Sequence, residues 1–203
     1  MGATGYAGAE IVRLLSRHPC AEVALVTSGR SAGKHLREEC PWLASDLVLQ
    51  EFEAESLTAD ITFLCQEAGF AMEHARELLP RTRIIDMSAD FRLDDKEQYR
   101  TYYKAEHTAP DLEAVYGLPE LVSREAIASA TLVANPGCYP TASLLGLMPL
   151  VKASLVAGTP VIDAKSGVSG AGRSRKETEY LFTELDGGFR AWQAAGLPVV
   201  SGN

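Results

Sequence analysis

Short apolar runs alternate with amphipathic stretches along most of this sequence, and this alternation limits the folds that the chain can adopt. The apolar runs are bounded by turn or polar residues, as buried strands are, and they cover residues 22–27, 61–65, 84–87 and 131–134. Between them, apolar side chains recur at helical spacing in residues 8–15, 68–79 and 124–129. This order predicts an α/β fold with a doubly wound parallel sheet, covered by helices on both faces.

A longer apolar helix is predicted from Pro140 to Val151, and Gly158-Thr159-Pro160 then breaks the pattern. Residues 161–164 are a further strand candidate. No repeat or low-complexity linker separates the segments. Because the character of the chain changes at Gly137-Cys138, we predict one domain over residues 1–137 and part of a second over 138–203.

The composition is that of an ordinary globular protein, with 46% hydrophobic residues in a chain of 203. A formal net charge of -8 argues against a nucleic-acid surface but leaves room for a small anion in a local cationic pocket. The longest apolar stretch, residues 144–151, is shorter than the roughly 20 residues that span a membrane. The cysteines show no metal or disulfide spacing, which favours a reducing, cytoplasmic setting and no metal; they are Cys20, Cys40, Cys65 and Cys138.

Three glycines form a G-x-x-G-x-x-G loop that runs directly into the first predicted helix. Glycine lets the backbone approach a pyrophosphate, and the N–H groups at a helix start favour its charge. Such a loop alone is a weak signal, because it also needs a strand before it. The residues that we predict to bind a dinucleotide here are Gly2, Thr4, Gly5, Tyr6, Ala7 and Gly8.

The second predicted strand ends at Thr27-Ser28-Gly29-Arg30, and no carboxylate follows it. A site for NAD usually has Asp or Glu there, to hold the ribose 2′-hydroxyl. Ser28 and Arg30, with Lys34, could instead receive the 2′-phosphate of NADP. The alternative is a solvated loop with a surface arginine.

The segment Asn135-Pro136-Gly137-Cys138-Tyr139-Pro140-Thr141 lies between a predicted strand and the long apolar helix. Pro140 suits a first helical turn, so the Cys138 thiol is expected at a helix N-terminus, where a thiolate is stabilised. An accessible thiolate can attack an activated carbonyl. The alternative is a small buried cysteine in a tight turn.

Taken together, the motifs resemble those of N-acetyl-gamma-glutamyl-phosphate reductases of arginine biosynthesis. The matching segments follow the family's order along almost the whole chain; they are GATGYAGAE (2–10), DMSADFR (86–92), YGLPE (116–120), NPGCYPT (135–141) and DAKSGVSGAGR (163–173). The resemblance implies a Rossmann-type NADP domain, a mixed α/β substrate and oligomerisation domain, and a homo-oligomer. It also implies that Cys138 attacks N-acetylglutamyl 5-phosphate and that hydride from NADPH reduces the resulting thioester to the semialdehyde.

The same resemblance implies a substrate site around Cys138. Ser88 and Arg92 follow a predicted strand, and a glycine-rich segment could hold phosphate or carboxylate. The residues predicted to bind substrate are Ser88, Arg92, Asn135, Ser166, Ser169, Gly170 and Arg173. The alternatives are a capped surface loop for Ser88 and Arg92, a flexible loop for the glycine-rich segment, and a purely turn-forming role for Asn135.

The sequence departs from the family's pattern at both ends. The family has a strand before the glycine loop, and residues 197–203 do not match its histidine-bearing segment. None of His18, His35, His74 and His107 is therefore assigned to catalysis, and we expect low activity from this chain alone. Three other functions stay open: a related reductase acting on aminoadipyl or aspartyl phosphate, a fragment that binds nucleotide without turnover, and, less favoured because it leaves the glycine loop unexplained, a cysteine hydrolase.

Overall fold

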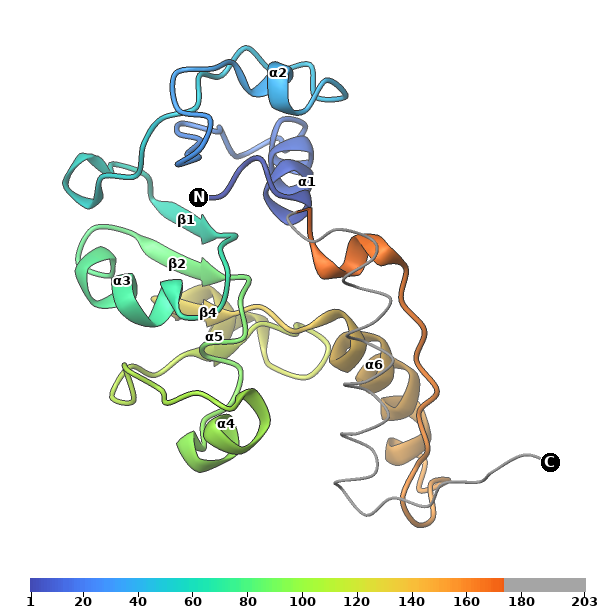
Figure 1. Cartoon of the computed structure of the whole chain (residues 1–203). Coiled ribbons are helices and arrows are strands. Elements are labelled where there is room, and N and C mark those ends of the chain that lie inside the picture. Colours follow the sequence, from blue (N-terminus) through green and yellow to red (C-terminus); the bar gives the residue numbers. More distant parts are fainter. Residues whose placement is uncertain (174–203) are drawn as a thin grey trace. The chain divides into compact units, whose positions relative to one another are not determined.

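The computed structural model of the chain describes residues 1–173. The chain divides into two compact units, residues 1–164 and 165–203, which are considered separately. The first unit contains a parallel sheet whose strands alternate with helices along the chain (Figure 1). The predicted parallel α/β architecture is confirmed. The division at residue 137 stays a prediction, and the part of the second predicted domain after Arg173 lies outside the described residues.

Four parallel strands form the sheet in the order β1-β2-β4-β3. They are β1 (Ile61–Leu64), β2 (Arg83–Asp86), β3 (Val115–Tyr116) and β4 (Leu132–Ala134). Asp86 lies opposite both Leu64 and Ala134. The strands therefore end at one edge, and in open parallel sheets ligands bind outside this carboxyl edge.

The helices predicted from apolar spacing are confirmed to within a few residues at their ends. The first unit contains α1 (Tyr6–Leu15), α2 (Leu36–Glu39), η1 (Ala54–Ser56), α3 (Phe70–Leu78), α4 (Lys96–Tyr103), α5 (Arg124–Ser129) and α6 (Cys138–Lys152), and the second unit begins with η2 (Val168–Ala171). The sequence did not indicate α4, whose single buried residue is Tyr99 and whose start is fixed by the Asp95 cap. Within residues 1–173, no helix combines the length and apolarity needed to cross a bilayer.

Two of the predicted strands are wrong. Residues 22–27 are assigned to no strand and make only an isolated parallel bridge, from Thr27 to Gln50. Residues 161–164 are assigned to no strand, and Val161 is 76% exposed. The reason is the same in both cases: an apolar run becomes a strand only where a neighbouring backbone pairs with it. The short strand β3 was not predicted.

Two buried clusters form the core of the first unit. One packs α3 against the sheet and includes Leu64, Ala75, Leu78, Ile84 and Leu132. The other lies beneath α1 and includes Ala9, Val12, Val26, Leu36 and Leu49. Full burial of each leucine or isoleucine stabilises the folded state by about 1.5–3 kcal/mol. The first cluster therefore holds α3 against the sheet, and the second holds α1 against the loop that contains Val26, Leu36 and Leu49.

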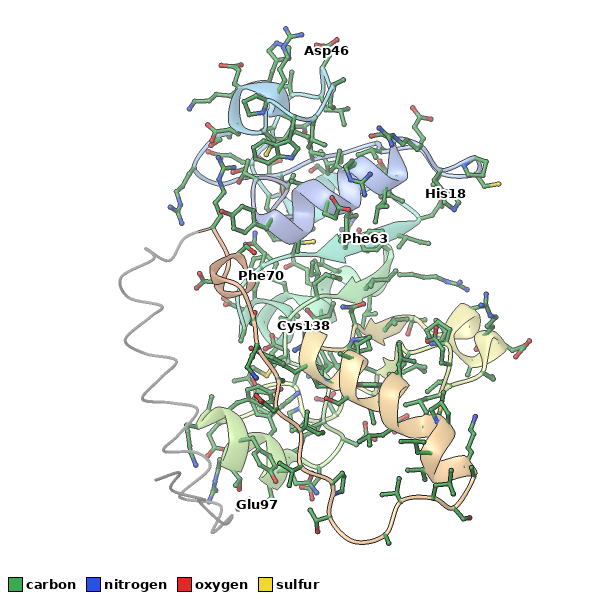
Figure 2. All side chains as sticks on the ribbon, turned by 90° about the vertical axis from the view of Figure 1, so that its right-hand side faces the viewer. His18, Asp46, Phe63, Phe70, Glu97 and Cys138 are labelled. Carbon is green, nitrogen blue, oxygen red and sulfur yellow. The ribbon has the colours of Figure 1, made fainter. Side chains whose placement is uncertain are left out.

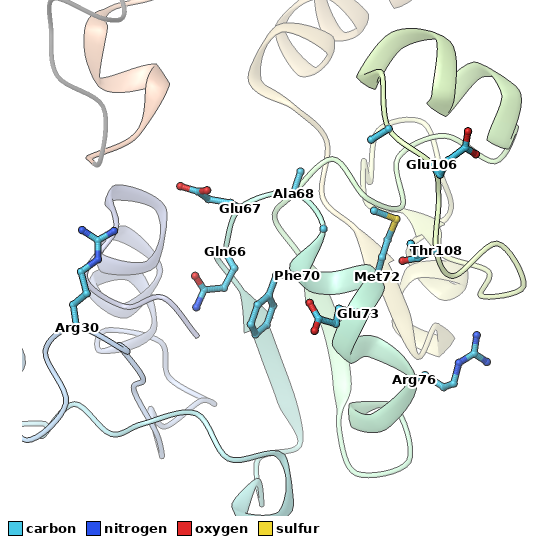
Figure 3. Close-up of a pocket in the computed structure, with 12 residues that line it drawn as sticks. Arg30, Gln66, Glu67, Ala68, Phe70, Met72, Glu73, Arg76, Glu106 and Thr108 are labelled. Atoms are coloured by element: carbon cyan, nitrogen blue, oxygen red, sulfur yellow. The ribbon is translucent and has the colours of Figure 1, made fainter.

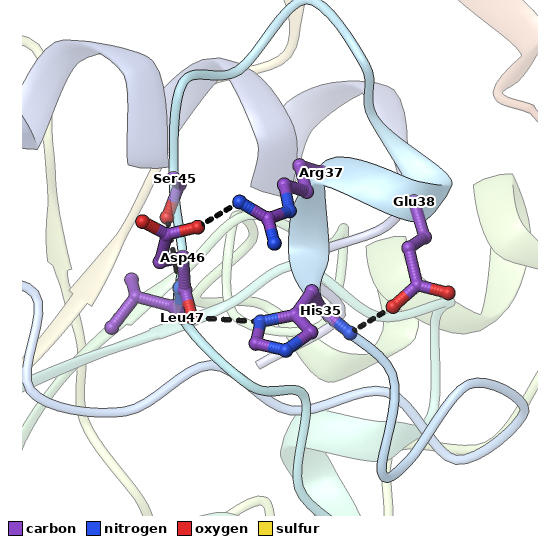
Figure 4. Close-up of polar contacts among 6 residues, drawn as sticks. All are labelled: His35, Arg37, Glu38, Ser45, Asp46 and Leu47. Carbon is purple, nitrogen blue, oxygen red and sulfur yellow. Dashed lines mark hydrogen bonds and ion pairs between the residues drawn. The ribbon is translucent and has the colours of Figure 1, made fainter.

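Polar contacts around α2 close the loop that carries part of the second cluster (Figure 4). The Glu38 carboxylate accepts a hydrogen bond from the His35 N–H at 2.8 Å, and His35 Nδ1 lies 3.0 Å from the Asp46 carbonyl oxygen. Arg37 forms an ion pair with the Asp46 carboxylate. These contacts hold the loop in a shape that buries Leu36 completely.

Candidate active site at the carboxyl edge of the sheet

The glycine loop packs so tightly that two of its glycines tolerate no side chain. Gly2 has a φ of 71°, and a Cβ there would lie 2.4 Å from the Cys65 carbonyl oxygen. A Cβ on Gly8 would lie 2.2 Å from the Gly2 carbonyl oxygen. The missing side chains therefore allow the loop to lie against the end of β1 and allow α1 to start directly above the loop.

The first turn of α1 leaves backbone N–H groups for a ligand. Gly5 is the N-cap and, among the described residues, no side chain caps this helix. The N–H groups of the first helical turn have no partner within a helix, and together with the dipole they attract an anion. Tyr6 is 46% exposed beside them. This geometry is compatible with the predicted role of Gly5, Tyr6, Ala7 and Gly8, which stays a prediction.

Thr4 and Ser28 come together from two loops. Their hydroxyl oxygens are 3.2 Å apart, and the Ser28 N–H donates to the Gln50 carbonyl oxygen at 3.0 Å. Arg30 is exposed two residues further on. Lys34, in contrast, pairs with the Glu39 carboxylate at 2.9 Å, which leaves Arg30 as the better candidate to meet a 2′-phosphate.

Arg30 also lines a hollow of 960 Å³ outside the end of β1 (Figure 3). Gln66 and Glu67 face it from the loop between β1 and α3, and Phe70 faces it from the first position of α3. The hollow also has Glu73 and Glu106 on its wall, so its charge is mixed. An anionic group is therefore expected to bind on the Arg30 side of the hollow, away from these carboxylates.

Cys138 is the first residue of α6, and it is exposed. Gly137 is the N-cap, and both the N–H and the hydroxyl of Thr141 donate to its carbonyl oxygen, at 3.0 and 2.9 Å. The turn begins at Asn135, directly after β4. The Asn135 N–H donates to the Asp86 carbonyl oxygen at 2.8 Å, which ties the start of the turn to the end of β2. Figure 2 shows Cys138 at the amino end of α6. The alternative of a buried cysteine is thus contradicted, whereas its role as nucleophile stays a prediction.

Arg92 holds the cysteine turn against the neighbouring strand. Its Nε donates to the Asn135 carbonyl oxygen and its Nη2 to the Met87 carbonyl oxygen, both at 2.8 Å. A Cβ on Gly137 would lie 3.1 Å from Arg92 Nη1. The guanidinium therefore joins the chain ends that leave β2 and β4. Its predicted contact with substrate stays a prediction, and the donors that these two bonds leave for it are on Nη1 and the second N–H of Nη2.

Ser88 is only 9% exposed and its hydroxyl is already used. It donates to Asp86 Oδ2 at 2.9 Å and accepts a hydrogen bond from the Asp90 N–H at 3.1 Å. These bonds give the hydroxyl a local role in the loop after β2, as the capped-loop alternative expects, although Ser88 is buried and not on the surface. The predicted substrate contact of Ser88 stays a prediction. Asn135 is half-buried, and its Nδ2 donates to the Pro136 carbonyl oxygen at 3.0 Å, which likewise shapes the turn.

Asp86 and Asp90 are fully buried carboxyl groups that the sequence did not single out. Asp90 accepts hydrogen bonds from the N–H groups of Gly69 and Met72, at the start of α3. Burial, together with the nearby Asp90 charge, raises the pKa of Asp86 to about 6, although hydrogen bonds from Ser88 and the Arg92 charge oppose the shift. In the sequence, only the D-x-S-x-D spacing at the end of a predicted strand could have indicated that these two carboxyl groups form hydrogen bonds in a turn.

The raised pKa of Asp86 predicts a stability that falls as pH rises. Asp86 binds its proton more tightly in the folded state than in the unfolded state. Its contribution to the free energy of unfolding is therefore fully present below pH about 4, and up to about 3 kcal/mol of it is lost as pH rises through 6. Asp86→Asn should abolish that loss. Urea unfolding between pH 4 and pH 7 would measure it, with Asp60→Asn as the control, because Asp60 is exposed and directly precedes β1. A slope equal in Asp86→Asn and wild type would contradict the assignment.

The glycine-rich segment belongs to the second unit. The Ser166 hydroxyl donates to the Gly167 carbonyl oxygen at 3.2 Å, and the Gly170 N–H donates to the same residue's carbonyl oxygen at 2.9 Å. A Cβ on Gly170 would lie 2.4 Å from Ser166 Oγ. The turn is therefore closed around Ser166. The predicted roles of Ser166, Ser169, Gly170 and Arg173 toward substrate stay predictions.

The sequence matches two family models in succession. "Semialdehyde dehydrogenase, NAD binding domain" matches residues 1–130, and "Semialdehyde dehydrogenase, dimerisation domain" matches residues 138–196. The relatives named N-acetyl-gamma-glutamyl-phosphate reductase include proteins of Thiobacillus denitrificans, 45% identical over 97% of this chain and 59% of their own, and of Desulforamulus reducens, 49% identical over 96% and 58%. A rice protein named "Probable N-acetyl-gamma-glutamyl-phosphate reductase, chloroplastic" is 45% identical.

The chain thus spans less than two thirds of the length of these relatives, at 59% and 58% for the two bacterial proteins. Nevertheless, the match of the first model covers more than half of the chain and includes the glycine loop, the sheet strands β1 and β2, and the Asp86 turn. The resemblance seen in the motifs is confirmed by these relatives. The chain therefore belongs to the semialdehyde dehydrogenase family.

Proposed function

We propose that this chain supplies the NADP-binding and cysteine-bearing parts of a reductase of arginine biosynthesis. The reaction is the reductive dephosphorylation of N-acetyl-L-glutamyl 5-phosphate to N-acetyl-L-glutamate 5-semialdehyde. The observation that carries the proposal is an exposed cysteine that begins a helix directly after β4 of a parallel sheet, in a chain whose glycine loop lies at the end of β1 of the same sheet. The names of the two bacterial relatives, both N-acetyl-gamma-glutamyl-phosphate reductases, support the choice of substrate.

Cys138 is the proposed nucleophile. Its sulfur attacks the acyl carbon, the bond from that carbon to the phosphate oxygen breaks, and phosphate leaves with the electron pair. A hydride then adds to the thioester carbon, the carbon–sulfur bond breaks, and the semialdehyde leaves while Cys138 regains its thiolate. The N–H groups of the first turn of α6 favour the thiolate before attack and after release.

The residues at the glycine loop fit NADP. The first turn of α1 has no side-chain cap, the loop backbone is kept bare by Gly2 and Gly8, and Ser28 and Arg30 stand where a carboxylate would select NAD. When bound, NADPH would supply the hydride. The chain's own contribution is to hold the pyrophosphate at the N-terminus of α1 and the 2′-phosphate near Arg30.

We assign no histidine within residues 1–173 to proton transfer in this reaction. His107 is buried, with Nε2 2.8 Å from the Asp90 carbonyl oxygen, and burial lowers its pKa. The His74 ring contacts the Phe70 ring at a tilt of 42°, with ring centroids 4.3 Å apart. Both have structural contacts. Arg92, Asn135, Ser88 and the segment with Ser166, Ser169, Gly170 and Arg173 remain the proposed substrate-binding residues.

A turnover assay tests the proposal directly. The purified chain is mixed with N-acetylglutamate semialdehyde, NADP and phosphate, and formation of NADPH is followed by absorbance. NADPH formed faster than with aspartate or aminoadipate semialdehyde supports the proposed substrate, and the reverse order favours the related reductases. NADPH binding without turnover on any of the three would favour the alternative of a nucleotide-binding fragment, since this chain covers 59% of the length of the Thiobacillus denitrificans relative.

Arg30→Ala should weaken binding of NADPH about 10- to 100-fold while changing NADH binding less than about twofold, because the lost charge-assisted contact is to the 2′-phosphate alone. Fluorescence titration of both nucleotides measures the two dissociation constants. Arg37→Ala is the matched control, because Arg37 is an exposed arginine that pairs with Asp46 instead. Equal losses for NADPH and NADH would place Arg30 outside the 2′-phosphate site.

A homo-oligomer in a reducing compartment such as the cytoplasm completes the proposal. The match to a dimerisation domain supports the assembly. In α6 none of the fifteen residues is buried, although the helix is rich in Leu, Met and Val, and Leu150 and Val151 are 45% and 59% exposed. An apolar helix exposed in this way is expected to pack against further protein.

A further inference from the structure

Asp90 carries a fully buried carboxyl group to which the proposed reaction gives no role. Its two oxygens lie 2.8 and 2.9 Å from the Gly69 nitrogen, and Oδ2 also accepts a hydrogen bond from the Met72 N–H at 3.2 Å. These donors belong to the start of α3. Burial of a carboxyl group is costly unless hydrogen bonds replace its water, so these bonds hold Asp90 and the start of α3 together.

The cap of α3 comes from another loop because the segment before the helix cannot supply one. Gly69 is the N-cap residue, and its φ of 100° is a conformation that favours glycine, which has no side chain to accept a hydrogen bond. The helix α4 shows the contrast, because Asp95 caps it from its own N-cap position. The bonds from Asp90 therefore join α3 to the loop after β2 as well as capping the helix.

The backbone of Asp90 holds a second segment. Its carbonyl oxygen accepts a hydrogen bond from His107 Nε2 at 2.8 Å, and His107 Nδ1 accepts one from the Ala109 N–H at 3.3 Å. Because a carbonyl oxygen can only accept, the ring carries its proton on Nε2. Residues 105–109 are thus fixed to the same residue that caps α3.

Both attached segments are walls of the hollow that Arg30 lines (Figure 3). One wall comes from residues 66–73 and the other from residues 105–108. The first wall follows Cys65, whose carbonyl oxygen lies against Gly2 of the glycine loop. A dinucleotide with its pyrophosphate at that loop and its 2′-phosphate near Arg30 would therefore lie along these walls.

The loop that carries Asp90 is also joined to the cysteine turn. Asp86 and Arg92, at the two ends of this loop, both bond to Asn135. The Asp86 carbonyl oxygen accepts from its N–H, and Arg92 Nε donates to its carbonyl oxygen, each at 2.8 Å. Within the loop, the Asp90 N–H donates to the Ser88 hydroxyl, which in turn donates to the Asp86 carboxyl group. One short loop therefore connects the walls of the hollow with the cysteine turn.

We propose that Asp90 is a positioning residue, which sets the distance between the bound dinucleotide and the Cys138 sulfur. The inference rests on the proposed reduction at Cys138. Because Asp90 is fully buried, it has no surface for substrate or cofactor and acts through the segments that it holds. A misplacement of about 1 Å at a reacting centre can lower a rate about a hundredfold. A change at Asp90 should therefore lower the rate of hydride transfer more than the affinity for nucleotide.

Asp90→Asn tests the inference with a side chain of the same size. Asparagine has one acceptor oxygen, so its amide N–H groups must face an N–H group at the start of α3. The purified chain is treated with iodoacetamide, with and without saturating NADPH, and alkylation of Cys138 is followed by mass spectrometry, with the exposed Cys20 as the internal reference. NADPH should slow alkylation of Cys138 at least about fivefold in wild type and less than about twofold in Asp90→Asn. The NADPH dissociation constant should change less than about threefold.

Asp95→Asn is the matched control, because it makes the same change in an exposed aspartate that caps α4 through the Glu97 and Gln98 N–H groups. A residue that only caps a helix affects stability, so Asp95→Asn should protect Cys138 as wild type does. Turnover gives a second readout. Asp90→Asn should lower kcat about 10- to 100-fold while the KM for NADP stays within about threefold, whereas Asp95→Asn should change neither.

Equal protection of Cys138 in wild type and Asp90→Asn overturns the inference, and so does an NADPH affinity that falls more than about tenfold, because Asp90 would then serve binding and not position. Wild type that binds NADPH without slower alkylation of Cys138 contradicts the proposed function itself, so the two failures are distinguishable. If Asp90→Asn does not fold, His107→Phe takes its place. It removes the bond to the Asp90 carbonyl and keeps the ring contacts of His107 with Phe91 and Tyr99, whose centroids lie 5.3 and 5.1 Å away. Protection of Cys138 in that variant equal to wild type likewise overturns the inference.

Discussion

Cys138→Ser is expected to lower the rate of NADPH formation from N-acetylglutamate semialdehyde, NADP and phosphate by at least about a thousandfold. Serine offers an alcohol oxygen, which is a much weaker nucleophile toward an acyl carbon than a cysteine sulfur. The described residues place no base beside it to compensate. An oxygen ester, if formed, would also accept hydride less readily than a thioester.

Cys20→Ser is the control for this experiment, because Cys20 is also exposed but lies far along the chain from the sheet edge that carries Cys138. NADPH affinity should stay within about twofold of wild type in both variants, which separates loss of chemistry from loss of fold. A second readout does not need turnover: mass spectrometry after mixing with the acyl phosphate should find an acyl group on Cys138. Equal rates in Cys138→Ser and wild type would remove Cys138 from the mechanism.

The parts of the fold that could be predicted from sequence are those governed by local pattern. β4 is buried at every position, and β1 and β2 each bury every second residue, so all three appear in the sequence as short, largely apolar runs. The helices α1 and α3 show their buried residues at helical spacing. The position of Cys138 followed from Pro140 and Gly137, whose helix-start preferences are also local.

The errors lie where a neighbour distant in sequence decides. Residues 22–27 have the composition of a strand, but their isolated bridge, from Thr27 to Gln50, is too short to make a ladder. Arg92 donates hydrogen bonds to the backbone carbonyls of Met87 and of Asn135, which is 43 residues away. No local sequence pattern indicates these bonds, so the sequence could suggest only a ligand-binding role for this arginine. The burial of Asp86 and Asp90 is likewise set by tertiary packing, which a polar D-x-S-x-D sequence conceals.

Gly8→Ala is expected to lower the free energy of unfolding by about 2 kcal/mol, although alanine is the better helix former. The gain in helix propensity is about 1 kcal/mol, whereas forcing a methyl group into packed structure costs up to about 3 kcal/mol. The added Cβ would meet the Gly2 carbonyl oxygen at 2.2 Å and Ala3 Cα at 2.9 Å. Both are backbone atoms, so no side-chain rotation relieves the contact.

The strain cannot be passed on to Gly2, because the loop is fixed from its other side. The Ala3 N–H is bonded to the Thr27 carbonyl oxygen at 3.1 Å, and Gly2 itself lies against the Cys65 carbonyl. α1 must therefore move away from the loop, which also separates its first-turn N–H groups from the place proposed for the pyrophosphate, so NADPH affinity should fall together with stability.

Gly5→Ala is the matched control in the same loop, since its Cβ would come no closer than 3.5 Å to the nearest atom outside its neighbours. Its cost should stay below about 1 kcal/mol, the usual loss for an N-cap change. Urea unfolding of the two variants measures the difference. If Gly8→Ala proved as stable as Gly5→Ala, the contact between α1 and the loop would be looser than the 2.2 Å clearance requires, and the anion site at the start of α1 would lose its structural basis.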